Sequence, residues 1–583
     1  MKRVLLAAVN AKYIHSNPAV RYLAAYAAAH VPAVAEGQTE VLVREYTINQ
    51  QMEQIMADIY RAEPEMIGFS CYIWNMNAVG HLVRNLHLIL PEVPIWLGGP
   101  EVSYDADKIL REYPEVTGIM EGEGEKTFAQ LLEAYGAVGD GIADLTGVKG
   151  ITYRHPFTGD ICIHEPQEIL DLDEVPFFYR DLPAGTFSNR VVYYESSRGC
   201  PFRCSYCLSS IDKKVRFRNT ELVKKELQFF LDANVPQVKF VDRTFNCDYK
   251  HAAGIWEYIR EHDNGITNFH FEIAADLLTE EELDLLATLR PGQVQLEIGV
   301  QSANSDTIHA IDRVMDLDHL RAVVARIRKG RNIHQHLDLI IGLPEEGMES
   351  FARSFDAVYA MEPDQFQVGF LKVLKGSAMY HRAKEYGIVY RQDAPYEVLA
   401  TNWMDYSEIL RLKGIEEMVE VYYNSCQFTH TMQLLTESGE SPFLLYQKLA
   451  DYYEDNGLNE RSHSRMDRFR ILRDFAVQVL AVPTGEIEAV LLYDLYLREN
   501  SRSRPAWAPD PSRGKAIFKE YFRELCGDKV DHRMLHGEVL DTDPAGFGGE
   551  GPWYVVFDYR RRDPLSGNAF VHVIEPIRTE GRE

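Results

Sequence analysis

Cysteine is scarce in this chain, with eight in 583 residues. Five of the eight are scattered, so the chain lacks the even, closely spaced set that a disulfide framework requires. These five are Cys71, Cys162, Cys247, Cys426 and Cys526. Isolated cysteines are usually small buried apolar residues, and we interpret these in that way. The scarcity argues against a small disulfide-stabilised secreted domain and favours a reducing compartment.

Long apolar runs are also absent. No stretch approaches the roughly 20 apolar residues that a membrane-spanning helix needs. The chain begins with a short apolar run, but Asn10, Lys12 and His15 interrupt it too early for the core of a signal peptide. We therefore interpret the first residues as a buried strand. The expected location is the cytoplasm, and no membrane partner is expected.

Positive charge is in short supply. The chain has 61 basic and 88 acidic residues, and its net charge is −27. This balance disfavours a broad surface that follows a phosphate backbone. We interpret the two basic runs, at residues 326–331 and 560–562, as solvated surface. Nucleic acid is therefore an unlikely partner in this interpretation.

The three remaining cysteines stand together in one short segment. Cys200, Cys204 and Cys207 have the spacing C-x3-C-x2-C. Three thiolates so close together can bind three irons of a [4Fe–4S] cluster and leave the fourth iron open to a small molecule. A closed structural zinc site needs four ligands, usually in two pairs, and the sequence has no second C-x-x-C. The spacing therefore predicts an iron–sulfur cluster with one open iron.

Residues 1–136 alternate between strand-like and helical segments, which predicts a parallel sheet with helices on both faces. The strand-like runs are residues 3–9, 40–46, 66–71, 94–97 and 118–120. The helical segments are residues 19–30, 51–61, 77–90, 106–113 and 125–135. Five such strands complete a flavodoxin-like domain, in which ligands bind at the carboxyl ends of the strands.

Residues 137–190 read as a connector that contains a hairpin around the turn at residues 156–160. The alternation of strand and helix resumes from residue 191 to 376, with strands expected at 191–194, 237–241, 268–273, 293–299, 335–341 and 365–371. Six units are fewer than the eight of a closed barrel, so an open (βα)6 partial barrel is expected. The cysteine segment follows its first strand, on the face where barrels carry out chemistry.

The third region, residues 377–583, has a different pattern. Helical periodicity dominates from residue 396 to about 500, and a strand pair is expected at residues 553–559 and 568–574. The tyrosines of this region, Tyr422, Tyr423, Tyr452 and Tyr453, fit core or surface positions at helical spacing. The complete fold class is therefore α/β, with a mostly helical C-terminal domain.

The cysteine segment, with the aromatic Tyr206 before its last cysteine, opens a partial barrel and resembles the radical S-adenosylmethionine (SAM) superfamily. The five-stranded domain in front resembles the cobalamin-binding domain of the B12-dependent class of that superfamily. The resemblance extends from residue 1 to about 390. The helical C-terminal region is similar to a domain of undefined role found in certain members. The resemblance implies three cofactors, namely a [4Fe–4S] cluster, SAM and cobalamin.

The resemblance also implies where SAM binds. Family members line the SAM pocket with residues at the carboxyl ends of the barrel strands. The matching candidates are Tyr206, Asp242, Asn246, Glu272, Glu297, Gln301 and Asp338. An acidic residue at such a position is about as often a solvated or capping carboxylate, so each of these is a candidate only.

Cobalamin is expected at the strand ends of the first domain. Glycines there allow the backbone to approach a bulky ligand closely. The candidates are Tyr13, His15, Ser70, Trp74, Gly98, Gly99, Glu101, Gly122 and Glu123. The Asp-x-His-x-x-Gly signature that supplies a histidine to cobalt is absent. His15 is one alternative cobalt ligand, although a loop histidine is more often only hydrogen-bonded, and Trp74 can instead cover the lower corrin face.

The resemblance implies that the open iron chelates SAM and that one electron cleaves the SAM sulfonium into methionine and a 5′-deoxyadenosyl radical. The leading hypothesis is a cobalamin-dependent methyltransferase acting on an unactivated carbon of a small molecule or peptide. Its electrons would come from a low-potential donor such as flavodoxin or ferredoxin. The alternatives are a rearrangement or oxidative cyclisation with the same cofactors, and a non-catalytic cobalamin or redox sensor. No acid, base or substrate-binding residue can be assigned.

Overall fold

The structure is a computed structural model that describes residues 2–137, 142–183, 185–187, 190–212, 214–437, 439–527, 531 and 533–574. It divides into two compact units. The first comprises Met1–Ile298, Asp306–Ile327 and Phe370–Asn402, and the second comprises Gly299–Ser305, Arg328–Gly369 and Trp403–Glu583. In the described residues, no helix combines the length and apolar character needed to span a bilayer.

The N-terminal part of the first unit is built on a seven-stranded sheet with the order β2-β1-β3-β4-β5-β6-β7. Its strands are β1 (Lys2–Asn10), β2 (Thr39–Thr47), β3 (Met66–Ser70), β4 (Ile95–Gly98), β5 (Gly118–Met120), β6 (Ile151–Arg154) and β7 (Ile161–Ile163). The first five are parallel, as predicted. The hairpin expected in the connector forms β6 and β7, which extend this sheet in the antiparallel direction.

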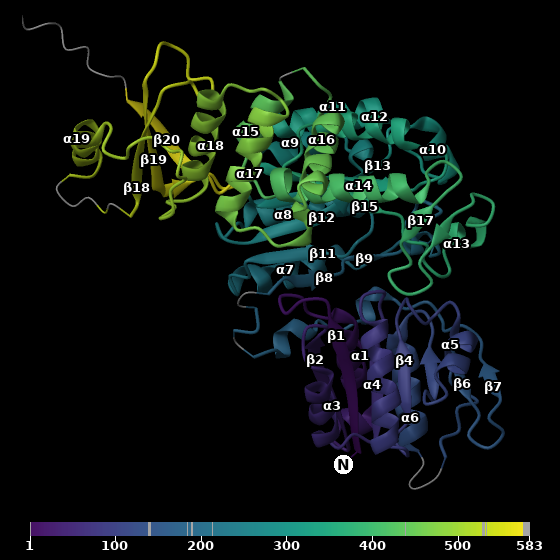
Figure 1. The fold of residues 1–583 in the computed structure, drawn as a ribbon. Helices are drawn as coiled ribbons and strands as arrows, with labels where there is room; N and C mark the ends of the chain where they lie inside the picture. Colours follow the sequence, from purple (N-terminus) through teal and green to yellow (C-terminus); the bar gives the residue numbers. More distant parts are fainter. Residues whose placement is uncertain are drawn as a thin grey trace, which may run out of the picture. The chain divides into compact units, whose positions relative to one another are not determined.

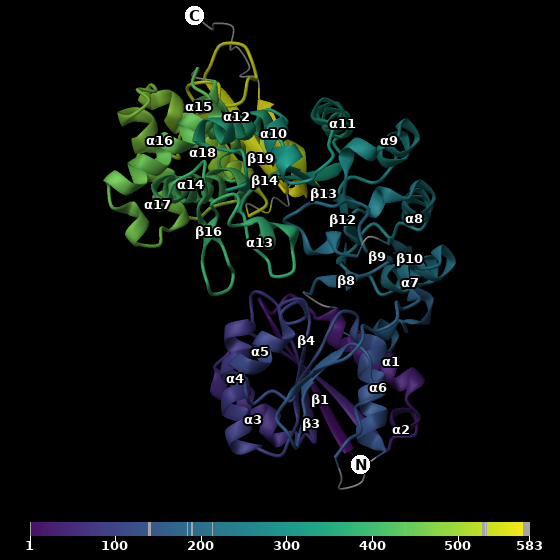
Figure 2. The same ribbon diagram turned by 90° about the vertical axis from the view of Figure 1, so that its right-hand side faces the viewer.

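Helices cover both faces of this sheet (Figure 2). One face carries α1 (Pro18–His30) and α6 (Gly124–Gly136), and the other carries α3 (Met52–Arg61), α4 (Met76–Ile89) and α5 (Ala106–Glu112). β1 is buried on both sides, with Leu6 in one core and Leu5 in the other. This explains why β1 is a continuous apolar run rather than an alternating one. The short α2 (Pro32–Ala35) follows α1.

The central parallel sheet begins in the first unit with the order β8-β11-β12-β13. These strands are β8 (Val192–Tyr194), β11 (Gln237–Phe240), β12 (Asn268–Ile273) and β13 (Val294–Gln301). They alternate with α7 (Thr220–Asp232), α8 (Tyr249–Glu261) and α9 (Glu280–Ala287), as Figure 1 shows. Short elements of the same unit are α13 (Ala378–Arg382), β16 (Val389–Tyr390) and β17 (Val398–Ala400).

In the second unit the order continues from the end of β13 as β13-β14-β15. Here lie β14 (Ile333–Ile341) and β15 (Gln365–Phe370), with α12 (Met348–Tyr359) between them. α10 (Ser305–Ala310) and α11 (Leu317–Gly330) follow β13 in the chain and lie mostly in the first unit. The sheet therefore has six strands with β8 and β15 as its outer members, which agrees with the predicted open arrangement.

The C-terminal part is helical and then antiparallel. Its helices are α14 (Tyr406–Val419), α15 (Thr429–Thr436), α16 (Pro442–Asp455), α17 (Arg465–Gln478), α18 (Thr484–Arg498) and α19 (Lys515–Cys526). α18 is buried on nearly all sides, so its apolar residues show no single stripe. The predicted strand pair is a three-stranded sheet, because β18 (Leu535–Leu540) pairs with β19 (Trp553–Arg562), which pairs with β20 (Ala569–Ile574).

Candidate functional site

The three clustered cysteines lie in the loop of a small hairpin. The hairpin strands are β9 (Ser197–Arg198) and β10 (Arg216–Phe217), which pair antiparallel with Arg198 opposite Arg216. Gly199 opens the loop with φ +97°, and a Cβ there would lie 2.7 Å from the carbonyl oxygen of Lys214. Only glycine fits such a position without strain. The backbone thus forces the chain to turn tightly just before the first cysteine.

The thiols of this loop are suited to binding soft metal ions. Cys200 and Cys204 are buried, Cys207 is half-buried, and none forms a disulfide. Burial raises the pKa of Cys204, and the nearby charge of Arg313 opposes that rise. Coordination to iron deprotonates such thiols, and thiolates are the usual ligands of iron–sulfur clusters. Three free thiols within eight residues therefore fit a [4Fe–4S] cluster.

Of the other five cysteines, only Cys71 is buried as expected. Cys162, Cys247, Cys426 and Cys526 are half-buried, which corrects the sequence interpretation. Cys162 and Cys526 pack against the rims of apolar clusters, which cover only part of each side chain.

Arg313 is a residue of the site that the sequence did not reveal. Its Nη1 lies 3.9 Å from the Sγ of Cys204 and 3.5 Å from the hydroxyl of Tyr206. The backbone supports this contact, because the amide of Ser205 donates to the carbonyl oxygen of Ile311 at 2.8 Å. More than 100 residues separate Arg313 from the cysteines, so spacing gave no signal. The structure therefore adds one half-buried cation beside the cluster ligands.

Asp242 and Asn246, both predicted SAM contacts, are buried and already engaged. Asp242 accepts hydrogen bonds from Ser196 (2.9 Å to its hydroxyl) and from the Ser197 hydroxyl at 2.5 Å. Burial raises the pKa of Asp242 to about 7. The Asn246 side chain exchanges two hydrogen bonds with the backbone of Ala274. Both residues hold the ends of barrel strands in place, and direct contact with SAM stays a prediction.

Glu272 and Glu297 are brought together by one lysine. Lys239 Nζ lies 2.9 Å from Glu297 and 3.9 Å from Glu272, and Arg243 lies 3.1 Å from Glu272. These side chains form a charged cluster on neighbouring strands. In the second unit, Gln301 is buried with φ +70°, and Asp338 lies 3.0 Å from His336. The SAM-binding roles of all four predicted residues stay predictions.

His15 is hydrogen-bonded. Its Nδ1 lies 2.6 Å from the hydroxyl of Tyr193. Burial lowers the pKa of His15, and the charges of Lys12 and Lys239 lower it further, so the ring is neutral at pH 7. A neutral imidazole can ligate a metal through Nε2 only if Nδ1 carries the proton and donates it to the tyrosine oxygen. The hydrogen-bonded alternative weighed from the sequence is therefore present in the structure.

Aromatic side chains lie in the loops after β1 and β3. Trp74 stacks on Tyr72 with ring centroids 4.3 Å apart and is 45% exposed. Tyr13 is exposed, and the guanidinium of Arg190 lies over its ring. An exposed stacked indole after β3 can cover the face of a planar ligand. The assignment of Trp74 and Tyr13 to cobalamin stays a prediction.

The glycines and Ser70 have different local roles. Gly99 has φ +110°, and a Cβ there would lie 2.6 Å from the carbonyl oxygen of Cys71, so the fold itself requires glycine. At Gly98 the nearest atom to a Cβ is 3.4 Å away, and at Gly122 nothing lies within 4 Å. Gly122 therefore leaves open space at the end of β5. The hydroxyl of Ser70 accepts a hydrogen bond from Asn17.

Glu101 is buried and paired within its own unit. Lys375 Nζ lies 3.2 Å from its carboxylate, and the hydroxyl of Tyr396 donates to it. This arrangement ties the loop after β4 to the segment after β15. Its predicted contact with cobalamin stays a prediction.

Glu123 joins the end of β5 to the cysteine hairpin. Arg216 lies 3.1 Å from Glu123, and Arg198 lies 3.4 Å from it. Arg198 also lies 2.9 Å from Glu125. Burial alone would raise the pKa of Glu123, but the hydrogen bond from Arg216 and the charge of Arg198 lower it, so the carboxylate is ionised. Both strands of the hairpin are thus held by one residue at the start of α6.

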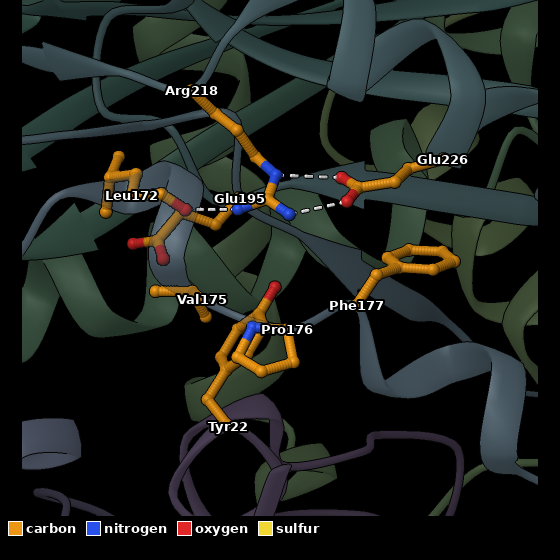
Figure 3. Close-up of a pocket in the computed structure, with 8 residues that line it drawn as sticks. All are labelled: Tyr22, Leu172, Val175, Pro176, Phe177, Glu195, Arg218 and Glu226. Atoms are coloured by element: carbon orange, nitrogen blue, oxygen red, sulfur yellow. Dashed lines mark hydrogen bonds and ion pairs between the residues drawn. The ribbon is translucent and has the colours of Figure 1, made fainter. Parts of the chain in front are cut away.

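A cavity beside this hairpin is too small for a substrate. It has a volume of about 10 Å³, which suffices for roughly one water. Figure 3 shows its lining, with Arg218 and Glu226 joined by two hydrogen bonds of 3.0 and 2.6 Å. The remaining lining residues are Tyr22, Leu172, Val175, Pro176, Phe177 and Glu195.

Three family models match the chain in succession. Residues 4–132 match the B12 binding domain, and residues 194–358 match the radical SAM superfamily. Residues 384–538 match a family described as a protein of unknown function, DUF4080. These matches confirm the predicted order of an N-terminal cobalamin domain, a radical SAM domain and a C-terminal domain of undefined role. The predicted domain boundaries stay predictions.

Two curated relatives illustrate the similarity. An uncharacterized methyltransferase from Pyrococcus horikoshii is 25% identical over 60% of this chain and 74% of its own length. The cobalamin-dependent radical SAM methyltransferase TokK from Streptomyces tokunonensis is 25% identical over 67% of this chain. The match spans 62% of the length of TokK, so the chain covers about three fifths of that relative.

Solved structures share the fold. The cobalamin-dependent SAM radical enzyme OxsB superposes over 91% of this chain and 76% of its own, with a TM-score of 0.58 and 15% identity. The methyltransferase TsrM from Kitasatospora setae, solved with cobalamin and a [4Fe–4S] cluster, covers 68% of this chain and 80% of its own, with a TM-score of 0.54 and 17% identity. The chain therefore carries a B12 binding domain at residues 4–132 and a radical SAM domain at residues 194–358, and these solved structures share its fold.

Proposed function

We propose that this protein is a cobalamin-dependent radical SAM methyltransferase acting on an unactivated carbon of a small molecule or peptide. The observation that carries the proposal is the hairpin of Cys200, Cys204 and Cys207, whose free thiols lie in the same unit as the B12-binding domain. The names of relatives such as TokK support methyl transfer. The cofactors are a [4Fe–4S] cluster, SAM and cobalamin.

The residues of this chain have distinct tasks in the proposal. The three cysteines hold the cluster, and Arg313 places a positive charge beside Cys204. Asp242 and Asn246 hold the strand ends around the SAM pocket. When bound, the cluster and SAM supply a carbon-centred radical and cobalamin supplies a methyl carrier. The protein holds these groups in register and keeps water out.

Two further parts of the proposal concern partners and location. An external low-potential donor, such as flavodoxin or ferredoxin, supplies the electron, because the described residues contain no second clustered cysteine set. We place the protein in the cytoplasm. The scattered, unpaired cysteines support this placement, since a reducing compartment keeps thiols free.

A radical cyclisation is the second candidate function. The anaerobic magnesium-protoporphyrin IX monomethyl ester cyclase of Rubrivivax gelatinosus is 22% identical over 59% of this chain. The two candidates use the same cofactors and differ in the fate of the SAM methyl group.

The test begins with anaerobic reconstitution of the full chain with iron, sulfide and hydroxocobalamin, followed by addition of SAM and of dithionite as the electron donor. The matched variant replaces the three cysteines by serine, and Cys162→Ser serves as control because Cys162 lies in β7, away from the loop. We expect iron–sulfide absorbance and 5′-deoxyadenosine release in the parent and the control, and loss of both in the triple variant. An unchanged chromophore in the triple variant would contradict the assignment of the cluster ligands.

The second stage uses SAM labelled at its methyl group with an anaerobic extract of small molecules and peptides. Label in a new product, together with deoxyadenosine, supports methylation. An unlabelled product with deoxyadenosine supports cyclisation or rearrangement. Cobalamin binding without any deoxyadenosine release would favour a sensor.

A further inference from the structure

The C-terminal region contains a cavity to which no function has been assigned. Its volume is about 350 Å³, within the range of pockets that bind small metabolites. It lies entirely in the second unit. The walls come from α14, α16, α17 and the loop between the last two, and its lining residues are Glu417, Val421, Tyr453, Leu458, Asn459, Glu460, Arg461, Ser462, His463 and Arg468.

Hydrogen bonds fix the position of Tyr453, which lines this cavity, and of the helical turn next to it. The hydroxyl of Tyr453 is 2.6 Å from that of Tyr422, and both side chains are buried. Tyr422 lies in a turn of π-helix, Glu420–Asn424, that continues α14. Such turns are rare and are frequent at functional sites. The turn is fixed by Asn424, whose amide side chain exchanges hydrogen bonds with the backbone of Phe366 at 2.9 Å.

Charged residues of both signs line the cavity, and three of them, Glu417, Glu460 and Arg461, are exposed to solvent. The neighbouring Arg465 and Arg470 of α17 form ion pairs. In the described part of the chain, by contrast, Arg461 and Arg468 have no ion pair, and neither do Glu417 and Glu460. Arg468 and Glu417 come from different helices, and both act on the hydroxyl of Tyr453. Burial is the main cause that raises the pKa of the Tyr453 hydroxyl. The charge of Arg468 lowers this pKa, and the charge of Glu417 raises it further.

The remaining polar group, His463, is oriented by the protein. Its Nε2 donates to the carbonyl oxygen of Leu458 at 2.8 Å, because a carbonyl can only accept. Nδ1 is therefore the acceptor in the neutral ring. The ring of His463 meets that of Tyr453 edge-on, with centroids 5.9 Å apart. Together with Val421 and Leu458, these rings give the cavity an apolar side.

We infer that this cavity binds a small zwitterion, a molecule with one carboxylate, one ammonium group and an apolar body, such as an aromatic amino acid. Arg468 and Arg461 face the carboxylate, and Glu417 and Glu460 face the ammonium. A simple anion would place its charge among two carboxylates, and a simple cation among two guanidinium groups. A ligand with both charges satisfies both pairs at once. The inference is independent of the cluster and cobalamin.

The test measures binding of three probes to the full chain by isothermal titration calorimetry. L-Phenylalanine carries both charges, L-phenylalaninamide lacks the carboxylate, and N-acetyl-L-phenylalanine lacks the ammonium. We expect phenylalanine to bind about tenfold more tightly than either analogue, since a hydrogen-bonded charge contact is worth roughly that factor. Equal affinities for the three probes, or no binding of any at 10 mM probe (roughly the weakest affinity of interest), would overturn the inference.

Matched variants assign each charge. Arg468→Gln should weaken phenylalanine about tenfold and leave phenylalaninamide unchanged, while Glu417→Gln should weaken phenylalanine but not its N-acetyl form. Arg468→Lys should restore part of the loss, which excludes misfolding as its cause. Arg470→Gln is the control, because Arg470 is exposed and pairs with Asp467 outside the cavity. An effect of Arg470→Gln as large as that of Arg468→Gln would also overturn the inference.

Discussion

At the scale of single residues, Arg313 is the side chain with the clearest expected effect on the cluster. It places a positive charge 3.9 Å from Cys204. A nearby cation stabilises the reduced, more negative state of a cluster. Arg313→Gln should therefore lower the reduction potential by on the order of 50–100 mV. A redox titration followed by electron paramagnetic resonance measures this, Arg313→Lys is the charge-preserving control, and an unchanged potential would contradict the assignment.

His15 leads to a second prediction at this scale. A phenol usually donates to an imidazole nitrogen, which leaves the proton of His15 on Nε2 and makes that atom unable to ligate cobalt. We therefore expect bound cob(II)alamin to show no nitrogen superhyperfine coupling from the protein. His15→Ala should leave the electron paramagnetic resonance spectrum unchanged. A coupling in the parent that disappears in His15→Ala would instead establish His15 as the ligand.

Glu346, in the second unit, has a buried carboxyl whose protonation should make the free energy of unfolding depend on pH. It is fully buried, and its Oε1 accepts from Ser302 (2.7 Å) and Ser354 (2.8 Å). Burial raises the pKa of Glu346 to about 7. The folded-state pKa of Glu346 lies above its unfolded-state value, so the folded protein favours the protonated carboxyl. The contribution of Glu346 to the free energy of unfolding is therefore complete below about pH 4.5 and is lost as pH rises through about 7.

The expected size of this effect is up to about 3 kcal/mol between pH 4.5 and pH 8. Glu346→Gln should remove the difference, since the amide cannot ionise. Thermal unfolding of parent and variant at pH 5 and pH 8 provides the measurement. Glu349→Gln, in the first turn of α12, is the control. Equal pH dependence in parent and Glu346→Gln would show that Glu346 is ionised throughout.

At the scale of elements, Glu123 decides how firmly the cysteine hairpin is held. It contacts both Arg198 and Arg216, one on each hairpin strand. Leaving two partly buried guanidinium groups without their carboxylate costs about 1–3 kcal/mol. Glu123→Gln should therefore increase amide hydrogen exchange in residues 197–217 and lower the iron retained per chain.

The control for this element is Glu168→Gln, because Glu168 is exposed and forms an ion pair with Lys149 at the surface. It should change neither hydrogen exchange nor iron content. Exchange in the hairpin that is the same in Glu123→Gln and in the parent would show that β9 and β10 are held by their own hydrogen bonds.

Elements also differ in how well the sequence predicted them. The five parallel strands of the first sheet and the six of the central one follow from runs of apolar residues that alternate with helical segments. β18 was missed because its pattern, Leu535 to Leu540, is interrupted by His536 and Gly537, which fit a loop equally well. Its strand character comes from pairing with β19, which lies later in the chain.

At the scale of the whole molecule, the two cofactor regions rest on different cores. The N-terminal sheet has its own two apolar clusters, and the three cysteines of the hairpin loop, Cys200, Cys204 and Cys207, belong to neither. Replacement of Cys200, Cys204 and Cys207 by serine should therefore abolish cluster binding and leave the affinity for cobalamin unchanged. A spectral titration with hydroxocobalamin measures this affinity. In the same titration, Gly99→Ala should bind cobalamin more weakly, because the new Cβ would clash with the backbone of Cys71. A parallel loss of cobalamin binding in the serine variant would show that the two regions are coupled.

The sequence by itself determined the features that are local in the chain. These are the cysteine triplet, which needs only eight residues, and the alternation of strands and helices, which follows from the periodicity of apolar residues. The tertiary structure decided which distant side chains meet. Arg313 reaches Cys204, and Glu123 reaches Arg198 and Arg216, only after the strands have paired. The reason is physical, because a charge is placed beside a thiol or another charge by the path of the backbone, which spacing within the sequence does not encode.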